Sequence, residues 1–234
     1  MKFLIITGVS GNLGKELLKY FESHDYQKIY AFGSKTKLDS LNLKWNTNVE
    51  FIYDVDFTNE EEVNSVFKKI KLTKNDELFI VHTIGAYSWG KYFYEYSKDE
   101  LLKLYDSNFL TSFLLSKYAV KSVIGNKGGS IVFISSITAL EYVSKRSIYA
   151  LSKNSLLYLS KIINEECEEH NFSANVIVPS TILTESNLKW LKDKTDSIKW
   201  ITPIEIAKVI QNIFENYTVL RNSVILMKDR FIDR

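Results

Sequence analysis

The segment Ser147–Lys153 reads SIYALSK, in which a tyrosine precedes a lysine by four residues. A phenol has a pKa of about 10, and a neighbouring ammonium favours the phenolate and lowers that value. Tyr149 and Lys153 could therefore exchange a proton with a substrate near neutral pH. The same spacing recurs at Tyr87/Lys91 and Tyr94/Lys98. With 14 tyrosines in the chain, some such pairs arise by chance, so the surrounding elements must decide among them.

Short apolar runs alternate along the chain with longer amphipathic runs, which predict helices. Seven apolar runs are predicted strands: Lys2–Gly8, Lys28–Gly33, Val49–Val55, Leu78–Gly85, Gly128–Ser136, Ala174–Pro179 and Asn222–Met227. Two long helices are expected over about 97–123 and 147–170. This alternation predicts one doubly wound α/β domain over 1–234, a parallel seven-stranded sheet with helices on both faces. Ligands of such sheets bind beyond the carboxyl ends of the strands.

Several helix starts are marked by capping residues. Thr58 with Glu61, and Ser97 with Glu100, have the spacing of a capping box, in which each side chain bonds the other residue's backbone N–H. Pro203 follows Thr202 at the first position of a further predicted helix. These signals place the helices that must carry the candidate site.

The first strand joins the first helix through ITGVSGNLGKE, residues Ile6–Glu16. Gly8, Gly11 and Gly14 are spaced by three within this loop. Glycines here let the backbone turn tightly and approach a pyrophosphate, which then lies on the helix N-terminus. Because the loop directly follows the first strand of an α/β chain, we expect it to bind a dinucleotide; the alternative is a plain tight turn.

At this loop the chain resembles the short-chain dehydrogenase/reductase family, whose usual pattern is Thr-Gly-x-x-x-Gly-x-Gly. Thr7, Gly8 and Gly14 match it, whereas Asn12 replaces the middle glycine and Gly11 gives the spacing of the family's longer members. The resemblance extends to about residue 227 and implies a Rossmann fold with a bound nicotinamide cofactor. The departure at Asn12 leaves the detailed loop conformation open.

The resemblance extends to a catalytic set. Tyr149 follows Ser136 by 13 residues, the spacing that the family uses, and Asn108 in LYDSNFLTSF matches the family's helix-four asparagine. It implies that Tyr149 is the general acid for reduction and the base for oxidation, and that Ser136 bonds the substrate oxygen. Lys153 would hold the nicotinamide ribose, and Asn108 would position a water that relays protons to Lys153. The alternatives are that Ser136 only caps a loop and that Asn108 is a buried polar residue.

The second predicted strand ends in Gly33-Ser34-Lys35, with no acidic residue. An acid there would bond the ribose diol and repel a 2′-phosphate. Ser34 and Lys35 could instead hold that phosphate, which favours NADP(H) while NAD(H) remains possible. The alternative is that Lys35 is a solvated turn residue.

Further cofactor contacts follow from the resemblance. Asp54 would lie near the adenine amino group with Val55 against the ring, and the backbone of Ile182 and the hydroxyl of Thr184 would meet the nicotinamide carboxamide. The remaining expected contacts are Ser10, Gly11, Asn12, Leu13, Ile84, Gly85 and Pro179. His82, where the family usually begins Asn-Asn-Ala-Gly, is expected to be structural rather than catalytic.

The aromatic stretch AYSWGKYFYEYSK follows the fourth predicted strand. It either borders the substrate pocket or packs on the core, and Tyr87 and Trp89 are its best pocket candidates. The polar stretch at about 185–200 is expected to form a substrate lid, with Trp190 closing over the pocket or only anchoring the lid.

The formal net charge of +2 and scattered basic residues indicate no nucleic-acid partner. Cys167 is the single cysteine, and the three histidines have no metal-ligand spacing. The N-terminal apolar run Phe3–Ile6 is too short for a membrane span, so we expect a cytoplasmic protein with no metal.

The favoured function is NADP(H)-dependent reduction of a carbonyl substrate, or oxidation of the corresponding alcohol. PSTILTESN, residues Pro179–Asn187, is similar to the dihydropteridine-reductase-like subgroup, although Ser136 is a residue that this subgroup lacks. A third alternative is a non-catalytic NADP(H)-binding regulator. The resemblance also implies a homodimer or homotetramer through the two long helices.

Overall fold

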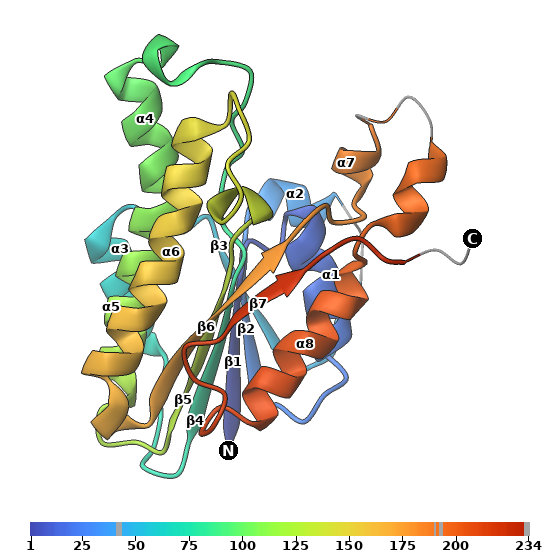
Figure 1. The fold of residues 1–234 in the computed structure, drawn as a ribbon. Coiled ribbons are helices and arrows are strands. Elements are labelled where there is room, and N and C mark those ends of the chain that lie inside the picture. The colour runs from blue at the N-terminus through green and yellow to red at the C-terminus, as the bar shows by residue number, and fades with distance from the viewer. Residues whose placement is uncertain (41–43, 190, 192–193, 232–234) are drawn as a thin grey trace.

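The computed structural model describes residues 1–40, 44–189, 191 and 194–231. Its centre is a parallel seven-stranded sheet in the order β3-β2-β1-β4-β5-β6-β7 (Figure 1). The strands are β1 Lys2–Thr7, β2 Lys28–Gly33, β3 Val49–Tyr53, β4 Glu77–His82, β5 Gly128–Ile134, β6 Phe172–Pro179 and β7 Val224–Met227. The chain runs outward from β1 to β3, then returns to place β4 against the other edge of β1. The predicted doubly wound fold is confirmed.

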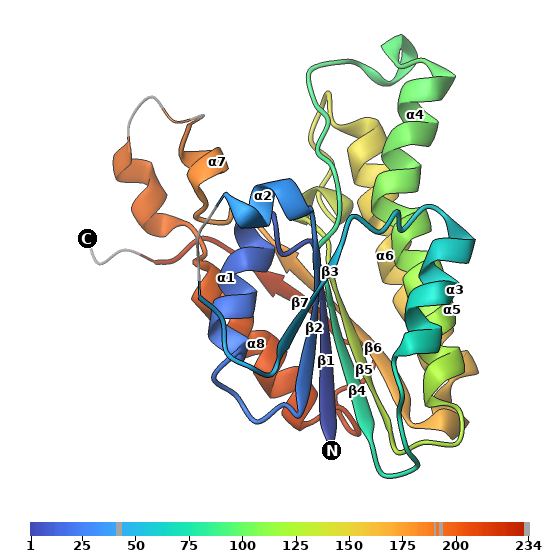
Figure 2. The ribbon, with the colours of Figure 1, turned by 180° about the vertical axis from the view of Figure 1, so that it is seen from behind.

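Helices cover both faces of the sheet (Figure 2). They are α1 Asn12–Phe21, α2 Lys35–Asp39, α3 Glu60–Lys69, α4 Lys98–Tyr105, α5 Thr111–Val123, α6 Ser147–Glu166, α7 Glu185–Leu188 and α8 Pro203–Glu215. One core is shared by α1 and α8, with Phe21 packed against Phe214. The other lies under α3, α5 and α6, where Leu115 and Ile163 are buried.

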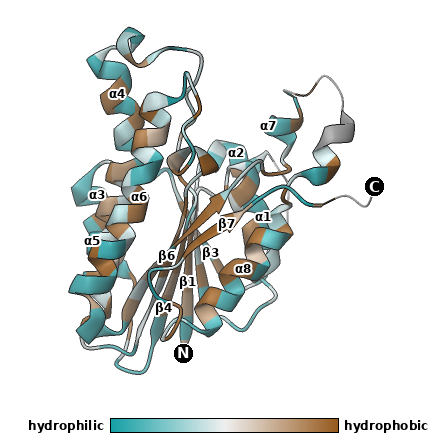
Figure 3. Ribbon diagram, viewed as in Figure 1, coloured by the Kyte–Doolittle hydropathy of each residue, from teal (hydrophilic) through white to brown (hydrophobic). Residues whose placement is uncertain are grey.

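Apolar residues concentrate on the strands and on the helix faces that turn toward the sheet (Figure 3). Every residue of β4, β5 and β6 is buried, as expected for strands covered on both sides. The edge strand β7 alternates between exposed and half-buried positions instead. The sheet is therefore a rigid platform whose carboxyl edge carries the loops of interest.

The helix expected over 97–123 is continuous but changes its winding. Between α4 and α5 lies a π-helical turn, η2 Asp106–Leu110, which contains Asn108. Such turns recur at functional sites, because the extra residue redirects a side chain. The second expected helix ends earlier than predicted, with α6 stopping at Glu166 before a short 3₁₀ turn, Glu168–His170.

The capping box predicted at Thr58 and Glu61 is wrong. The Asp56 carboxylate accepts hydrogen bonds from both the backbone N–H and the hydroxyl of Thr58, at 2.8 and 2.7 Å. Asn59 therefore caps α3 and accepts from the N–H groups of Glu61 and Glu62. The box between Ser97 and Glu100 is confirmed.

Pro203 is at the start of α8 as predicted, behind the cap formed by Thr202. In the described part of the chain, no helix combines the length and apolar character that a bilayer crossing requires.

Candidate active site

The site lies beyond the carboxyl ends of β4 and β5, where α6 begins. Ser136 follows β5 and is hydrogen bonded to the side chain of Tyr149, in the first turn of α6. The Ser136 oxygen already accepts from the Thr138 hydroxyl at 3.1 Å. It also accepts from the Thr138 N–H at 3.4 Å, so both of its lone pairs are used and we assign the Ser136 proton to the phenol oxygen.

The environment of Tyr149 favours its neutral form. Burial raises the pKa of the Tyr149 phenol, and the hydrogen bond from Ser136 opposes that rise. The Tyr87 ring adds to the rise, whereas the Arg146 cation counters it. The expectation that Lys153 lowers this pKa is therefore wrong for the structure: burial dominates, and Lys153 directs its ammonium elsewhere. Tyr149 carries its proton at neutral pH and can donate it.

Lys153 lies one helical turn beyond Tyr149 and is only 7% exposed. Its ammonium donates to the carbonyl oxygen of Ile134 at 3.0 Å. The backbone carbonyl of Lys153 in turn accepts from the Ser135 hydroxyl at 2.9 Å, which fixes α6 against the end of β5. Burial lowers the pKa of Lys153 to about 8. The group therefore changes charge near neutral pH.

Asn108 is fully buried in the π-helical turn, and its side chain is held at both ends. Its Oδ1 accepts from the backbone N–H of Ala86 at 2.8 Å, and its Nδ2 donates to the Ala86 carbonyl and to the Ser152 hydroxyl. Both amide donors are thus used, while Oδ1 keeps one lone pair for a further donor.

Gly85 is the point where Asn108 and Lys153 meet. A side-chain carbon at Gly85 would lie 2.6 Å from Asn108 Oδ1 and 2.9 Å from Lys153 Nζ. The loop that follows β4 therefore needs a glycine at position 85, so that the side chains of Asn108 and Lys153 can approach each other.

The glycine loop fits a dinucleotide. Gly8 has a φ of 72°, and a side chain at Gly14 would collide with the Gly8 carbonyl oxygen. Gly11 is the N-cap of α1 without a side-chain bond to the helix, and the first turn holds no acidic residue. The leading N–H groups of α1 are thus free of side-chain caps, as a bound pyrophosphate requires.

Predicted cofactor residues from four strand ends line one cavity of about 400 Å³. They are Gly8 and Ser10 after β1, Ser34 after β2, Asp54 and Val55 after β3, and Ile84 after β4. Ser10 accepts a hydrogen bond from the N–H of Ser34, which ties the first two loops together. The size, the glycine backbone and the strand-end position all suit the adenosine half of a nicotinamide cofactor.

Lys35 is exposed at the start of α2, beside this cavity's Ser34. Its ammonium pairs with Asp39 at 2.6 Å and lies 5.3 Å from the centre of the Tyr53 ring. Its N–H bonds the Asp54 carboxylate at 3.2 Å. An exposed ion pair of this kind is weak, so a phosphate could replace Asp39 as its partner.

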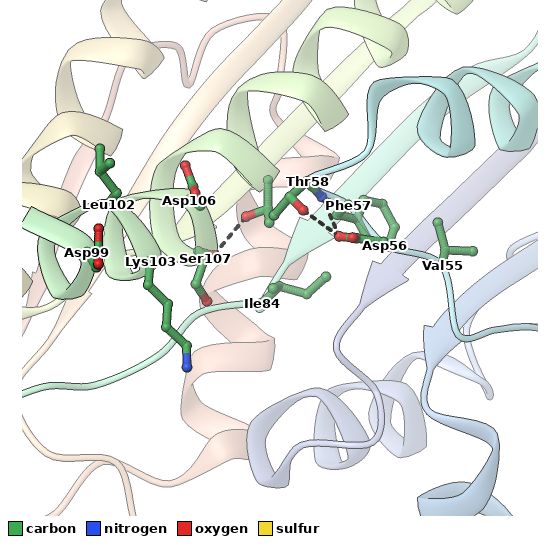
Figure 4. A pocket seen from close by; sticks show the side chains of 11 residues that line it. Val55, Asp56, Phe57, Thr58, Ile84, Asp99, Leu102, Lys103, Asp106 and Ser107 are labelled. Carbon is green, nitrogen blue, oxygen red and sulfur yellow. Dashed lines mark hydrogen bonds between the residues drawn. The ribbon is translucent and has the colours of Figure 1, made fainter.

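A second cavity, of about 600 Å³, adjoins the first between the β3 end and the α4 region (Figure 4). Val55, Phe57 and Ile84 line both cavities. Lys103 and Ser107 from α4 and the π-helical turn line only the second. The sequence did not predict this second cavity, because the cavity depends on how α4 packs beside the strand ends.

The segment after β6 reaches back to the glycine loop. Pro179 ends β6, Ile182 bridges to Ile201, and Thr184 caps α7. Asn12 at the start of α1 donates from Nδ2 to the Ser186 hydroxyl at 2.8 Å. The residue that departs from the family's glycine pattern thus links the cofactor loop to the expected lid.

His82 is buried between two hydroxyls. Its Nδ1 lies 2.8 Å from the Thr7 hydroxyl, and its Nε2 lies 3.3 Å from that of Thr111. Burial, reinforced by the Lys153 charge, lowers the pKa of His82 to about 3. The ring is neutral and joins β1, β4 and α5, a structural arrangement.

The aromatic stretch supplies one wall of the site. The Tyr87 ring meets the Tyr149 ring edge to face with 4.8 Å between centroids. Trp89 is 55% exposed on the same loop, and Tyr94 is 70% exposed. Trp190 lies outside the described residues.

Arg146 is a neighbour of Tyr149 that the motif search missed. Its guanidinium carbon lies 5.8 Å from the centre of the Tyr87 ring. Arg146 precedes Tyr149 by three residues, about one helical turn, and this spacing could have indicated that the two side chains are neighbours.

Comparison with known proteins gives a consistent result. A family model described as short chain dehydrogenase matches residues 2–195. Carbonyl reductase family member 4 of Xenopus laevis is 24% identical over 219 residues, 92% of each chain. A dihydropteridine reductase of Dictyostelium discoideum is 26% identical over 220 residues, covering 92% of this chain and 87% of the relative.

Solved structures share the fold at low identity. ElxO with NADP bound superposes with a TM-score of 0.83 at 24% identity, covering 97% of this chain and 96% of that one. A 4-hydroxyisoleucine dehydrogenase complexed with NADH gives a TM-score of 0.82 at 22% identity, covering 97% of each. Neighbours of this fold thus bind either form of the cofactor.

Proposed function

The chain belongs to the short-chain dehydrogenase family and is an oxidoreductase, and on that premise we propose that it is an NADP(H)-dependent carbonyl reductase with Tyr149 as its general acid. The observation that carries the proposal is the hydrogen bond between Ser136 and Tyr149, with Lys153 one helical turn away. Membership of an enzyme family disfavours the non-catalytic regulator.

The roles follow from the protonation states. Tyr149 is protonated at neutral pH and donates its proton to the substrate oxygen as negative charge develops there. When substrate binds, the Ser136 hydroxyl would turn its single proton from the Tyr149 oxygen to the substrate oxygen, which its contact with Tyr149 places within reach. Lys153, when protonated, would donate hydrogen bonds to the hydroxyls of the nicotinamide ribose. A bound nicotinamide cofactor supplies or accepts the hydride.

We assign the cofactor to the glycine loop and to the 400 Å³ cavity. Gly8, Gly11 and Gly14, with Ser10, Asn12 and Leu13 of the same loop, would surround the pyrophosphate. Asp54 and Val55 would contact the adenine, and Ser34 with Lys35 the 2′-phosphate of NADP(H). The nicotinamide end would meet Ile84, Gly85, Pro179, Ile182 and Thr184.

The proton path and the lid complete the proposal. The remaining lone pair of Asn108 Oδ1 would accept from a relay water that joins it to the Lys153 ammonium, since both groups approach Gly85. We assign the stretch at about 185–200 as the lid, because the bridge between Ile182 and Ile201 brings its two ends together. Tyr87 and Trp89 would border the substrate.

A dihydropteridine-reductase-like activity is the second candidate, favoured by the relative from Dictyostelium discoideum. Ser136 argues against it. Initial rates with NADPH and either quinonoid dihydropterin or a panel of ketones and aldehydes separate the two. Faster turnover of a simple carbonyl supports the first candidate, and turnover of the pterin alone would replace it with the second.

Exposed apolar side chains support a homo-oligomer. They lie on α4, α5 and α6, the helices for which the family resemblance implies an interface: Leu101, Leu102, Phe113, Leu151, Tyr158 and Ile162. A second copy of the chain would remove them from water. Sedimentation should therefore give a dimer or tetramer, and the double variant Leu151→Glu/Tyr158→Glu should sediment as a monomer; a monomeric wild type would refute the assignment.

A further inference from the structure

Arg146 is a cation without a carboxylate partner. Of the four arginines in the sequence, Arg221 pairs with Glu168 at 2.8 Å and Arg230 pairs with Glu205 at 2.7 Å. Arg234 lies outside the described residues. Among the residues that are described, no carboxylate pairs with Arg146 and no acceptor takes a hydrogen bond from its guanidinium. The side chain is half-buried, so it has lost part of its hydration without gaining a counter-charge.

The Arg146 guanidinium lies over the face of the Tyr87 ring. The rings of Tyr87 and Tyr149 meet edge to face. A guanidinium that faces an aromatic ring rather than a hydrogen-bond acceptor keeps its N–H donors available to a ligand. The Tyr87 ring thus lies between the Arg146 guanidinium and Tyr149, the proposed acid. The N–H donors of the Arg146 guanidinium make no hydrogen bond to any residue that the structure describes.

The backbone around Arg146 is fixed. Lys145, the preceding residue, adopts a left-handed φ of 64°, and its carbonyl accepts a hydrogen bond from the N–H of Gly90 at 2.9 Å. A non-glycine residue in this region stores strain, which proteins retain mainly at functional sites. The bond joins the loop that carries Tyr87 to the loop that ends at Arg146, so both side chains hold their positions relative to Tyr149.

The charges around this corner are mostly positive or already paired. Lys145 lies 4.7 Å from the centre of the Tyr92 ring, and Lys91 pairs with Glu100. Glu141, at the start of the same loop, pairs with Lys228. The first turn of α6 contains no acidic residue. An anionic group entering the site therefore meets a free guanidinium and no facing carboxylate from these elements.

We propose that Arg146 determines substrate specificity by binding a carboxylate on the carbonyl substrate, with Tyr87 as the ring that holds the guanidinium in place. The proposal rests on the reductase function proposed above. A single guanidinium matches the two oxygens of a carboxylate with two parallel hydrogen bonds. The substrate class is thus an oxo acid whose carboxylate lies about one ring away from the reacting carbonyl.

A matched pair of aldehydes tests the proposal: 4-formylbenzoate and its methyl ester, each reduced with NADPH. Wild-type protein should prefer the acid. Arg146→Gln should lower kcat/KM for the acid by about 10- to 100-fold, mainly through KM, because the lost interaction binds ground state and transition state alike. The ester should change by less than about twofold, and Arg146→Lys should keep part of the preference for the acid.

Arg221→Gln, at a surface arginine far along the chain, is the matched control and should leave both substrates unchanged. Equal wild-type kcat/KM for acid and ester, or an equal loss on both in Arg146→Gln, would overturn the proposal. Circular dichroism of each variant confirms that it is folded.

Calorimetry separates failure of this proposal from failure of the reductase function. If neither aldehyde turns over, the reductase function fails, and 4-formylbenzoate is then titrated into the protein with NADPH. Binding that Arg146→Gln abolishes and Arg221→Gln retains supports the carboxylate site. Absent binding, or equal binding by both variants, overturns the site independently of catalysis.

Discussion

The Lys153 ammonium donates a hydrogen bond to the Ile134 carbonyl oxygen across 3.0 Å, inside a nearly closed site. This neutral acceptor leaves the charge uncompensated, and burial lowers the pKa of Lys153 to about 8. The contact therefore couples the end of β5 to a group that titrates in the working range.

We predict an alkaline limb near pH 8 in kcat/KM for carbonyl reduction. In the proposed mechanism the protonated ammonium holds the nicotinamide ribose, so we expect activity to fall as the pH rises through the pKa of Lys153. Initial rates of carbonyl reduction between pH 6 and 10 measure this limb. The control variant Lys145→Met removes an exposed lysine and should show the same fall in kcat/KM near pH 8. A profile that stays flat to pH 10 would contradict this role.

His82 predicts a loss of stability in acid. Its pKa is lowered to about 3 in the folded protein, whereas a free histidine has about 6.5. Below pH 6.5 the unfolded chain binds a proton that the folded chain excludes, so stability falls as the pH falls. The slope is about 1.4 kcal/mol per pH unit for this group between pH 6 and 4.

Urea unfolding of wild type and His82→Asn across that pH range measures the difference. The variant should lose this part of the slope, whereas His170→Gln, at a partly exposed position, should keep it. Equal slopes in wild type and His82→Asn would show that the buried ring does not exclude the proton.

We predict that Lys35 sets the cofactor preference. Lys35→Glu should raise the KM for NADPH by about 10- to 100-fold and leave NADH within about twofold, because only NADPH carries the 2′-phosphate. Lys37→Glu, two residues along α2 and directed away from that side, is the control. Equal effects on both cofactors would defeat the assignment to NADP(H).

The bond between Asn12 and Ser186 predicts coupling of the lid to the cofactor loop. Asn12→Ala and Ser186→Ala should each weaken NADPH binding by about two- to tenfold, as expected for one hydrogen bond. The double variant should match the single ones, since both remove the same contact. Fluorescence titration with NADPH measures all three, and additive losses would show that the contact does not couple the two segments.

The fold could be predicted because its signals are local. The apolar runs predicted all seven strands to within two residues at nearly every end, and the Ser97/Glu100 pair fixed the start of α4. The π-helical turn was not foreseeable, because it depends on Asn108 bonding both backbone groups of Ala86, 22 residues away.

The sequence spacing could indicate which residues of the site lie close together, whereas their roles remain predictions. Ser136 and Tyr149 are brought together as their spacing implied. Contacts between distant segments have no spacing pattern in the sequence. Asn12 is hydrogen bonded to Ser186, 174 residues away, and the Arg146 guanidinium lies over the Tyr87 ring. The direction of the Tyr149 pKa was misjudged because burial, which a motif does not report, outweighs nearby charge.

Tyr149→Phe tests the central claim most directly. The variant should reduce an accepted carbonyl at least about 10²- to 10⁴-fold more slowly than wild type while NADPH binding persists, because only the proton donor is removed. Tyr94→Phe, which has the same spacing to a lysine but lies exposed on the surface, should retain full activity. Wild-type turnover by Tyr149→Phe would contradict the account.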